Sequence, residues 1–510
     1  MNTIEPDAAG NDQKAVLEFL GSEKRKCKRV DTHASIVFLE KDRVLKVKRA
    51  VRLPFLDYST IEKRKAACEE ELVVNKRFAP DIYRRVSAIT QGRNGLEIAG
   101  RGPALDWAVE MARFDEEQTF DHLARAGNIT PELADELADV LRDTHDRAAI
   151  SDGKTWLASV AGIIDRNSQT FRGEMELAQG AVEQLHERSH RWLAECSPLL
   201  QSRAAAGFVR RCHGDAHLGN IVLIGGRPIL FDAIEFDPVI ATTDILYDLA
   251  FPLMDLIHFG LKACANRLVN RYLQRSWMDN ADALRLLPLY LSMRAAIRAN
   301  VLFTKRQLSQ GDAHDVSEAK AYFDQALRHL EPARPSLIAI GGKSGTGKSL
   351  LAREAAAHIS PLPGAIILRS DVIRKQLFGV DPLTPLPGSA YAPDVTERIY
   401  RSLLDRARQV VRQGFSVIID AAFLHESERN ALCALARKIN ADFRPIFLTA
   451  DLAVRLDRIR SRKRDASDAT GEVATDQEGY DLGRLDWPTL DASSSLEQTL
   501  ERSKAFLLPQ

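Results

Sequence analysis

The chain has 510 residues, 45% of them hydrophobic, and its 70 Lys and Arg balance its 70 Asp and Glu. This length favours about three domains, with two or four allowed, and the zero net charge argues against bulk nucleic-acid binding while allowing a local basic patch. Six scattered cysteines without a C-x-x-C pair argue against a disulfide framework and a zinc knuckle. The polar N-terminus is no secretory signal, and the apolar runs are too interrupted to span a bilayer. We therefore expect a cytoplasmic protein without a membrane partner; the oligomeric state is left open.

Residues 1–30 form the first predicted segment. We interpret 1–12 as a loose tail and place a short helix within 13–30. The basic cluster at 24–29 is interpreted as a solvated face.

A hairpin is predicted next, from Ile36 to Leu39 and from Val44 to Lys48, with a turn at Asp42. Side chains alternate along a strand, so Lys46 and Lys48 lie on the same face. A helix over 59–78 and an apolar strand over 107–111 follow. Further on, Thr130-Pro131 predicts a helix start, with Thr as N-cap and Pro at the first helical position.

The stretch His213-Gly-Asp-Ala-His-Leu-Gly-Asn220, followed by Phe231-Asp232, carries the first chemical signal. Phosphoryl transfer of the kinase type needs an Asp that orients the acceptor hydroxyl, an Asn that reaches Mg²⁺ from the same loop, and a second Asp that holds metal against the phosphates. Asp215, Asn220 and Asp232 supply these groups in this order, with a strand Lys and a Glu-bearing helix upstream.

These residues resemble the aminoglycoside phosphotransferase family, a branch of the protein-kinase-like fold, over about 30–330. The resemblance implies an α+β bilobal domain, assigned here to 31–331, with ATP between a small N-lobe and a helical C-lobe. It implies these roles: Asp215 as catalytic base or orienter, Asn220 and Asp232 as metal ligands, Lys46 (or Lys48) as the nucleotide-binding Lys, Glu71 (or Glu70) as its helix partner, and Glu110 to Ala112 as the hinge facing adenine.

Two features of this domain give weaker support to the nucleotide and substrate assignments. The turn expected to cover the phosphates, Thr32-His33-Ala34-Ser35, has no glycine. Arg294 and Arg298 lie one helical turn apart, which suits either an anionic substrate or a structural pair in the C-lobe.

After a proline-bearing linker at 332–336, the chain reads Gly342-Lys-Ser-Gly-Thr-Gly-Lys-Ser349, which fits the phosphate-binding loop G-x-x-x-x-G-K-[ST]. An apolar strand precedes it and a helix follows it. The loop's backbone N–H groups and the helix N-terminus would bind phosphate oxygens. Lys348 would reach the β- and γ-phosphates and Ser349 would bind Mg²⁺. The predicted nucleotide-binding residues are Gly342, Lys343, Ser344, Gly345, Thr346, Gly347, Lys348 and Ser349.

Strands and helices alternate from 337 to 448, which predicts an α/β domain with a parallel sheet over 337–510. Asp371 follows a strand and Arg374 lies three residues on, which places both near one helix N-terminus that faces the phosphates. In small P-loop kinases an acid at this place can accept the acceptor hydroxyl's proton and the Arg can hold the substrate; the alternative is an N-cap Asp with a helix-face Arg. Asp420 ends another strand, either as a metal-binding acid or as an ordinary strand-end residue. The polar stretch 465–484 is interpreted as a mobile loop without an assigned role.

With the phosphate loop, Ser370-Asp371-Val372-Ile373-Arg374 resembles the P-loop kinases that include polynucleotide 5′-hydroxyl kinases and small-molecule kinases, over about 337–465. The segment Arg458 to Arg464 is a candidate lid whose arginines neutralise charge on the transferred group, or else a solvated helix. Its basic residues are Arg458, Arg460, Arg462, Lys463 and Arg464, of which Arg462 fits the resemblance best.

The sequence thus predicts a bifunctional phosphotransferase that uses Mg²⁺ and ATP in both domains. The first acceptor is a small-molecule hydroxyl, and the second is a small molecule or a nucleic-acid 5′-hydroxyl. Two alternatives remain: a regulatory protein in which one domain only binds ATP, and a P-loop ATPase. The acceptors do not follow from the fold.

Overall fold

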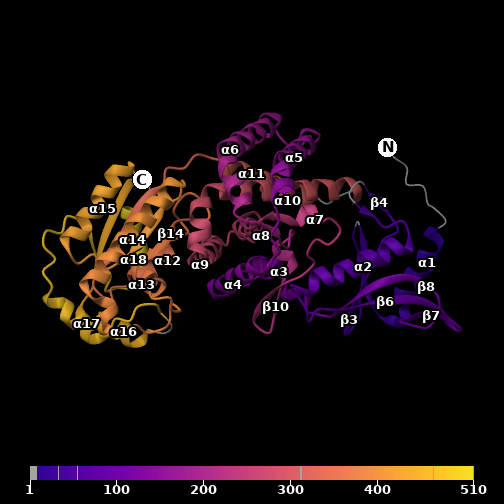
Figure 1. Ribbon diagram of the computed structural model, residues 1–510, viewed down its shortest axis with the longest axis horizontal. Helices are drawn as coiled ribbons and strands as arrows, with labels where there is room; N and C mark the ends of the chain where they lie inside the picture. Colours follow the sequence, from indigo (N-terminus) through magenta and orange to yellow (C-terminus); the bar gives the residue numbers. More distant parts are fainter. Residues whose placement is uncertain (1–8, 33, 54–55, 310–312, 463–464, 509–510) are drawn as a thin grey trace. The chain divides into compact units, whose positions relative to one another are not determined.

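The computed structural model describes residues 9–32, 34–53, 56–309, 313–462 and 465–508 (Figure 1). The chain folds into two compact units, which are considered separately. Unit 1 comprises residues 1–129, 140–162 and 200–255, and unit 2 comprises 130–139, 163–199 and 256–510. These units differ from the domain bounds 31–331 and 337–510 drawn from the sequence, which stay a prediction.

Unit 1 contains a six-stranded antiparallel sheet with strand order β1-β2-β3-β8-β6-β7. The expected hairpin is confirmed: Lys46 of β3 pairs with Val37 of β2 and, on its other side, with Val109 of β8. The strands are β1 Lys28–Asp31, β2 Ser35–Leu39, β3 Arg43–Lys48, β6 Tyr83–Gly92, β7 Gly95–Ile98 and β8 Ala104–Ala112, and a small pair is formed by β4 Arg52–Leu53 and β5 Leu56–Asp57.

A helix covers each face of this sheet. On one face, α1 (Ala9–Leu20) buries Val16 and Leu20 against Leu45. The expectation of a loose tail through residue 12 is therefore corrected, because the apolar residues of this helix complete the core; residues 1–8 lie outside the described part. On the other face, α2 (Ile61–Lys76) packs Cys68 against Val109.

Unit 1 also holds the polar stretch that follows the N-lobe. Its elements are η2 Glu116–Gln118, α3 Phe120–Arg125, β9 Val209–Arg211, η3 Leu218–Asn220, the hairpin β10 Ile221–Ile224 and β11 Arg227–Leu230, α7 Pro238–Ala241 and β12 Thr242–Asp244. The longer helices are α4 Pro131–Arg147, α5 Lys154–Arg172, α6 Gln179–Ala205, α8 Ile245–His258, α9 Lys262–Asn280, α10 Leu287–Ser309 and α11 Ala313–His329, and the first four contain residues of both units. The backbone N–H of Leu133 donates to Thr130 Oγ1 (3.3 Å), which confirms Thr130 as the cap of α4.

One helical stretch of the described residues, Lys262–Arg306, is long and apolar enough to cross a membrane, but 78% of its most apolar window is buried inside the protein. The core helix of a soluble protein passes the same test.

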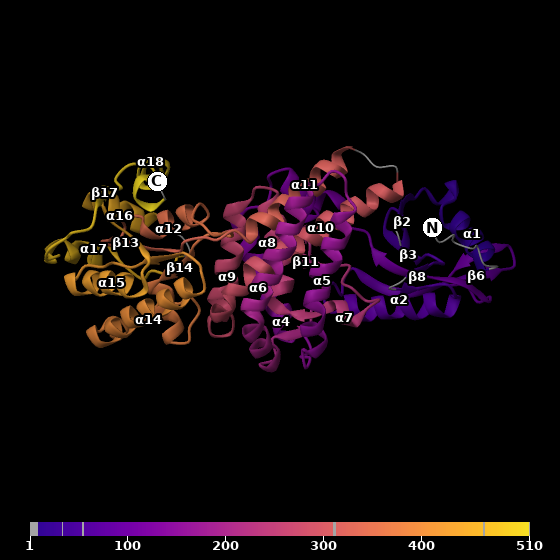
Figure 2. The same cartoon turned by 90° about the horizontal axis from the view of Figure 1, so that it is seen from above.

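The C-terminal part of unit 2 is built on a five-stranded parallel sheet with order β14-β15-β13-β16-β17. The parallel sheet expected from the sequence is confirmed. Helices α12 and α18 pack together over a core that includes Ile338 and Ile418. Helix α14 contacts β13, β14, β15 and α15, and α15 contacts β16 (Figure 2). The strands are β13 Ser336–Gly342, β14 Ile366–Arg369, β15 Val417–Asp420, β16 Asp442–Thr449 and β17 Thr489–Asp491; the helices are α12 Lys348–Ala356, α13 Ser370–Leu377, α14 Pro393–Arg412, α15 Glu426–Ile439, α16 Leu452–Ser461, α17 Gly471–Asp476 and α18 Leu496–Leu507.

Parallel pairing brings the carboxyl ends of neighbouring strands to one edge of the sheet, where ligands of such folds bind. Gly342, Arg369 and Asp420 end β13, β14 and β15 at this edge. Arg369 is aligned with Asp420 across the β14–β15 pair.

Candidate active sites

The first candidate site centres on Glu71 of α2, whose side chain is completely buried. Lys46 and Lys48 point to the same face of β3, as predicted, and both reach this carboxylate. Lys46 Nζ lies 2.8 Å from Oε1 and Lys48 Nζ lies 2.6 Å from Oε2. Glu71 is therefore the helix partner, whereas Glu70 is exposed. The two lysines are not alternatives, since each holds one oxygen.

Each lysine also has a second acidic partner. Lys46 Nζ donates to Asp232 Oδ1 at 2.5 Å, and Lys48 pairs with Glu235. The site is thus a chain of two cations and three carboxylates, in which Asp232 stands at the exposed end. Lys46 can reach Asp232 only because the segment after β11 turns back towards α2.

That turn is held by α2. Asn75 Oδ1 accepts the N–H of Ala233 at 2.7 Å, and its Nδ2 donates to the Ala233 carbonyl at 3.3 Å. The N–H of Asp232 donates to Tyr83 Oη at 3.1 Å. Asp232 has φ +59°, in the left-handed region that non-glycine residues adopt only when their surroundings require it.

The ion pairs oppose the effect of burial on ionisation. Desolvation would lower the pKa of Lys46, but Asp232 and Glu71 raise it well above its usual value. Desolvation would raise the pKa values of Glu71 and Asp232, but Lys46 lowers both, with help from Lys48. All three groups are therefore charged at neutral pH.

The predicted catalytic loop is held by its own polar groups. Asn220 Nδ2 donates to the Asp215 carbonyl at 3.0 Å and to Asp215 Oδ2 at 3.1 Å. His213 Nε2 lies 2.9 Å from the carbonyl of Phe231, which joins this loop to the turn before Asp232. The N–H of Gly214 donates to Asp248 Oδ1 at 2.8 Å. The loop thus presents Asp215 and Asn220 together.

Glu110 does not join this site. Its side chain lies on the opposite face of the sheet from Lys46, where it accepts from Arg85 Nε at 3.0 Å and from Ser87 Oγ at 3.1 Å. Its backbone belongs to a strand paired on both sides. The Glu110 side chain therefore has no place beside Lys46. The assignment of the segment Glu110 to Ala112, which ends β8, as the hinge facing adenine stays a prediction.

The turn expected over the phosphates is closed by Thr32, whose Oγ1 accepts the N–H of Ser35 at 3.0 Å; His33 lies outside the described residues. Of the arginine pair, Arg294 is buried in α10 of unit 2, and the Arg298 guanidinium lies 5.8 Å from the ring centre of Tyr322. A role of this pair with an anionic substrate stays a prediction.

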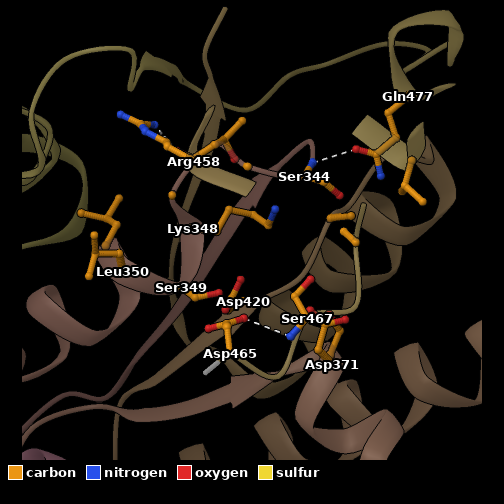
Figure 3. Close-up of a pocket in the computed structure, with 18 of the residues that line it drawn as sticks. Ser344, Lys348, Ser349, Leu350, Asp371, Asp420, Arg458, Asp465, Ser467 and Gln477 are labelled. Atoms are coloured by element: carbon orange, nitrogen blue, oxygen red, sulfur yellow. Dashed lines mark hydrogen bonds between the residues drawn. The ribbon is translucent and has the colours of Figure 1, made fainter. Parts of the chain in front are cut away.

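The second candidate site is a cavity of about 890 Å³ at the carboxyl edge of the parallel sheet (Figure 3). The phosphate loop, the start of α13, the end of β15 and the segment after α16 all line it. It collects nearly every residue that sequence reasoning proposed here: Ser344, Gly345, Thr346, Gly347, Lys348, Ser349, Asp371, Arg374, Asp420, Arg458 and Arg462.

The phosphate loop is stabilised by residues far along the chain. Lys348 Nζ donates to the carbonyls of Gly342 (2.7 Å) and Lys343 (3.0 Å). The N–H of Ser344 donates to Gln477 Oε1 at 2.7 Å. Gly345 has φ +84°, and a Cβ there would lie 2.7 Å from the Arg455 carbonyl, so only glycine fits.

Asp371 and Arg374 both line the cavity from α13. Desolvation raises the pKa of Asp371 above its usual value, and Asp420 adds to this, while Arg369 and a hydrogen bond from Ser467 oppose it. A raised pKa suits a group that accepts a proton. Arg374 Nη1 donates to the Ala390 carbonyl at 2.6 Å.

Arg369, which sequence reasoning missed, lies between the predicted metal ligands. Its Nε donates to Asp420 Oδ2 at 3.1 Å and its Nη2 to Ser349 Oγ at 3.0 Å. Nη2 also donates to Asp465 Oδ1 at 3.0 Å. The only signal in the sequence was its position at the end of a strand, two residues before Asp371.

The segment 465–484 is not a loop without a role. It contains α17 and the turn η6 (Gln477–Gly479), and Asp465, Ser467 and Gln477 line the cavity. Asp468 pairs with buried Lys375 of α13 at 2.6 Å. Polar composition concealed this packing because the segment folds through ion pairs rather than through an apolar stripe.

The arginines of the candidate lid differ in their contacts and exposure. Arg458 donates to the carbonyls of Ala492 (2.8 Å) and Ser494 (3.0 Å), which ties α16 to the segment after β17. Arg462 lines the cavity and donates to the Ser467 carbonyl at 3.3 Å. Arg460 is exposed. Lys463 and Arg464 lie outside the described residues.

Both sites offer the oxygen ligands that Mg²⁺ prefers in proteins. Asn220 and Asp232 would hold it in the first site, and Ser349 with Asp420 in the second. The bound ion would neutralise charge on the β- and γ-phosphates. The oxygens of Ser349 and Asp420 already share one cation, the guanidinium of Arg369, which shows that they converge on a single positive charge.

Two family models match the chain, and together they describe a phosphotransferase with two kinase-like domains. Residues 65–287 match the model of the phosphotransferase enzyme family, and residues 337–480 match that of an AAA domain family. Both resemblances drawn from the sequence are thereby confirmed, and the chain is a kinase-type enzyme. Enzymes of these classes generally use ATP and Mg²⁺.

The chain is similar to uncharacterised proteins of Mycobacterium tuberculosis (strain H37Rv) and Mycobacterium bovis, each 29% identical over 472 residues that cover 90% of both chains. Among solved structures, a choline/ethanolamine kinase family protein from Mesorhizobium loti matches 63% of this chain and 99% of its own (13% identity, TM-score 0.36). A gluconokinase from Sinorhizobium meliloti 1021 matches 34% and 93% (22% identity, TM-score 0.25).

Proposed function

We propose that the chain is a bifunctional phosphotransferase that transfers the γ-phosphoryl group of Mg²⁺–ATP to a hydroxyl acceptor in each domain. The first acceptor is a small molecule, and the second is a small molecule or a nucleic-acid 5′-hydroxyl. We further propose that it acts in the cytoplasm, without a membrane partner. The observation that carries the proposal is the cavity in which Lys348 and Ser349 of the phosphate loop meet Asp371 and Asp420.

In the second domain, Lys348 and the loop N–H groups bind the phosphates and Asp371 accepts the proton of the attacking hydroxyl. Arg374 holds the acceptor, and Arg462 neutralises charge on the phosphoryl group in flight. Desolvation, which raises the pKa of Asp371, supports its assignment as the base. A P-loop ATPase that uses water as its acceptor has no need of an acceptor-binding Arg374.

In the first domain, Asp215 orients the acceptor hydroxyl. Asn220 and Asp232 bind the metal, and Lys46 binds the phosphates. The support is the continuous contact from Glu71 through Lys46 to Asp232 and the hydrogen bonds from Asn220 to Asp215. A domain that only sensed ATP would not require Asp215.

The proposal is tested by product formation from radiolabelled ATP with the wild type, Asp215→Asn and Asp371→Asn. The acceptor panel contains sugars, aminoglycosides, amino alcohols, nucleosides and 5′-hydroxyl oligonucleotides. Each variant is expected to lose one class of product and keep the other, which assigns each acceptor to a domain. ATP turnover that never depends on an acceptor would refute transfer and favour the ATPase; products lost in only one variant would favour a single catalytic domain.

A further inference from the structure

A cation of the protein already contacts the oxygens that the proposed function gives to the metal in the second site. The Arg369 side chain, 14% exposed, ends β14 and hydrogen-bonds to Ser349, Asp420 and Asp465 at 3.0–3.1 Å. A guanidinium keeps its charge at every pH at which proteins are folded, so this cation cannot be removed by deprotonation. It can leave the site only by moving.

Ser349 and Asp420 are also the oxygens that the proposed function gives to Mg²⁺. A hydroxyl oxygen that accepts from Arg369 presents less of its lone-pair density to a metal, and a carboxylate paired with a guanidinium attracts a second cation less strongly. A guanidinium and a divalent ion therefore compete for the same pair of oxygens. The two side chains that carry these oxygens, Ser349 and Asp420, are labelled in Figure 3.

We infer that Arg369 is the resident counter-cation of the metal site: it neutralises Asp420 and occupies Ser349 until Mg²⁺ arrives with its nucleotide, and then keeps only Asp465. The inference rests on the proposed function in one respect, namely that the second site binds Mg²⁺–nucleotide.

Asp465 is the residue that makes this exchange feasible. Both its oxygens lie within 3.2 Å of Arg369 Nη2, so the guanidinium retains a carboxylate partner after it releases the other two groups. Asp465 also accepts the N–H of Ser467 at 3.0 Å, and Ser467 hydrogen-bonds to Asp371. Movement of Arg369 is therefore transmitted to the segment that contacts the proposed base.

Two consequences follow. Without nucleotide, the wild-type site binds divalent ions poorly, because its acids are already neutralised. Replacement of Arg369 by an uncharged residue of similar length leaves Ser349 and Asp420 free of that cation and creates a site that takes a divalent ion alone. This reverses the usual effect of a mutation in a metal site, since binding is gained.

The test is Mn²⁺ binding to the full chain without nucleotide, followed by the electron paramagnetic resonance signal of the free ion. Arg369→Met is expected to bind one more Mn²⁺ per chain than the wild type, at least tenfold more tightly than any weak wild-type binding at that site. The gain should vanish in Arg369→Met/Asp420→Asn. Arg444→Met is the matched control: it breaks an Arg–Asp pair (2.6 Å) of the same sheet outside the cavity and should gain nothing.

An Arg369→Met protein that keeps the wild-type circular dichroism spectrum and Mn²⁺ stoichiometry would overturn the inference. Should this variant fail to fold, Asp465→Asn provides an independent measurement. In an Asp232→Asn background, which weakens metal binding at the first site, Asp465→Asn should raise at least fivefold the Mg²⁺ concentration for half-maximal binding of a fluorescent ATP analogue. Asp476→Asn, an exposed acid of α17, should not; an unchanged requirement in Asp465→Asn would also overturn the inference.

These readouts do not depend on an acceptor. If no acceptor is phosphorylated while the Mn²⁺ site is gained, the transfer function fails and the counter-cation stands. If phosphoryl transfer is found and no Mn²⁺ site is gained, the transfer function stands and the counter-cation inference fails.

Discussion

Glu71 offers the sharpest test of the first site, because one buried carboxylate holds two lysines. Glu71→Gln keeps the shape and removes the charge, so Lys46 and Lys48 lose their common partner. At the observed separations of 2.8 and 2.6 Å, each ion pair is worth about 6 kcal/mol of gross Coulomb energy at an effective dielectric constant of about 20. Desolvation offsets most of this energy. Breaking one partner of a buried pair costs about 3–5 kcal/mol in practice.

We expect the lower end, about 3 kcal/mol, because the Gln oxygen still accepts one hydrogen bond and the lysines keep Asp232 and Glu235. Amide hydrogen exchange measures this loss of stability for individual segments of the chain. A local measurement is needed because the two units need not unfold together. Amides of β3 and α2 should exchange about 100-fold faster in Glu71→Gln, since about 1.4 kcal/mol is tenfold.

Glu70→Gln is the matched control, one residue away and exposed. It should change these rates by no more than about threefold, within the ±0.5 kcal/mol or so typical of surface substitutions. Equal effects of the two substitutions would refute the assignment of Glu71 as the shared partner.

The pH dependence of amide protection provides a second test of Glu71. The folded-state pKa of Glu71 is lowered, so its stabilisation is present above the unfolded value near about 4.3 and is lost as pH falls through the lower folded value. After correction for intrinsic exchange, the wild type should therefore lose protection in β3 as pH falls below about 4. Glu71→Gln should show a smaller loss.

Three further outcomes are expected. Asp371→Asn should lower kcat of the second domain by about 10²–10⁴-fold with unchanged ATP affinity. The acid limb of the wild-type pH–rate profile should lie above the ordinary Asp pKa of about 3.9, because desolvation raises the pKa of Asp371. An acid limb at or below that value would contradict the assignment of Asp371 as the base. Asn75→Ala should cost about 1–3 kcal/mol in urea unfolding of unit 1 by leaving the Ala233 N–H and carbonyl unpaired, whereas exposed Asn94→Ala should not. Arg455 packs against Gly345 of the phosphate loop and donates to the Ala474 carbonyl at 2.9 Å and to Glu478 at 2.8 Å. Arg455→Met loses both hydrogen bonds and should weaken the binding of an ATP analogue to the phosphate loop at least tenfold. Exposed Arg460→Met is the control, and an equal loss of affinity in both variants would show a nonspecific effect.

The parts of the sites that could be predicted are those coded by neighbouring residues. The phosphate loop is a strand, a glycine turn and a helix start within one short segment, so its pattern suffices. Asp215 and Asn220 share one loop for the same reason. The period of a strand placed Lys46 and Lys48 on one face, but it could not show that both contact Glu71.

The parts that could not be predicted depend on pairings across the chain. Arg369 meets Asp465 across 96 residues, and no periodicity in the sequence marks either residue. The segment 465–484 is polar and is held by polar contacts: Arg455 of α16 donates to the Ala474 carbonyl and to Glu478, and Gln477 accepts the N–H of Ser344. The side chain of Glu110 is a different case: strand alternation places it on the face opposite Val109, whereas the hinge role of the segment that ends at Ala112 stays a prediction.

The two sites lie in different folds, yet the carboxylate proposed to bind the metal has the same kind of partner in both. In each, the proposed ligand is paired with a protein cation: Lys46 on Asp232 at 2.5 Å, and Arg369 on Asp420 at 3.1 Å. An unpaired carboxylate in a partly desolvated site would tend to take up a proton and lose its affinity for metal, so the cation keeps the acid ionised until Mg²⁺ is bound. The consequence differs between the sites. Lys46 is also held by Glu71 and can remain in place, whereas Arg369 shares both metal-ligand oxygens and must move. Metal binding should therefore rearrange the second site more than the first.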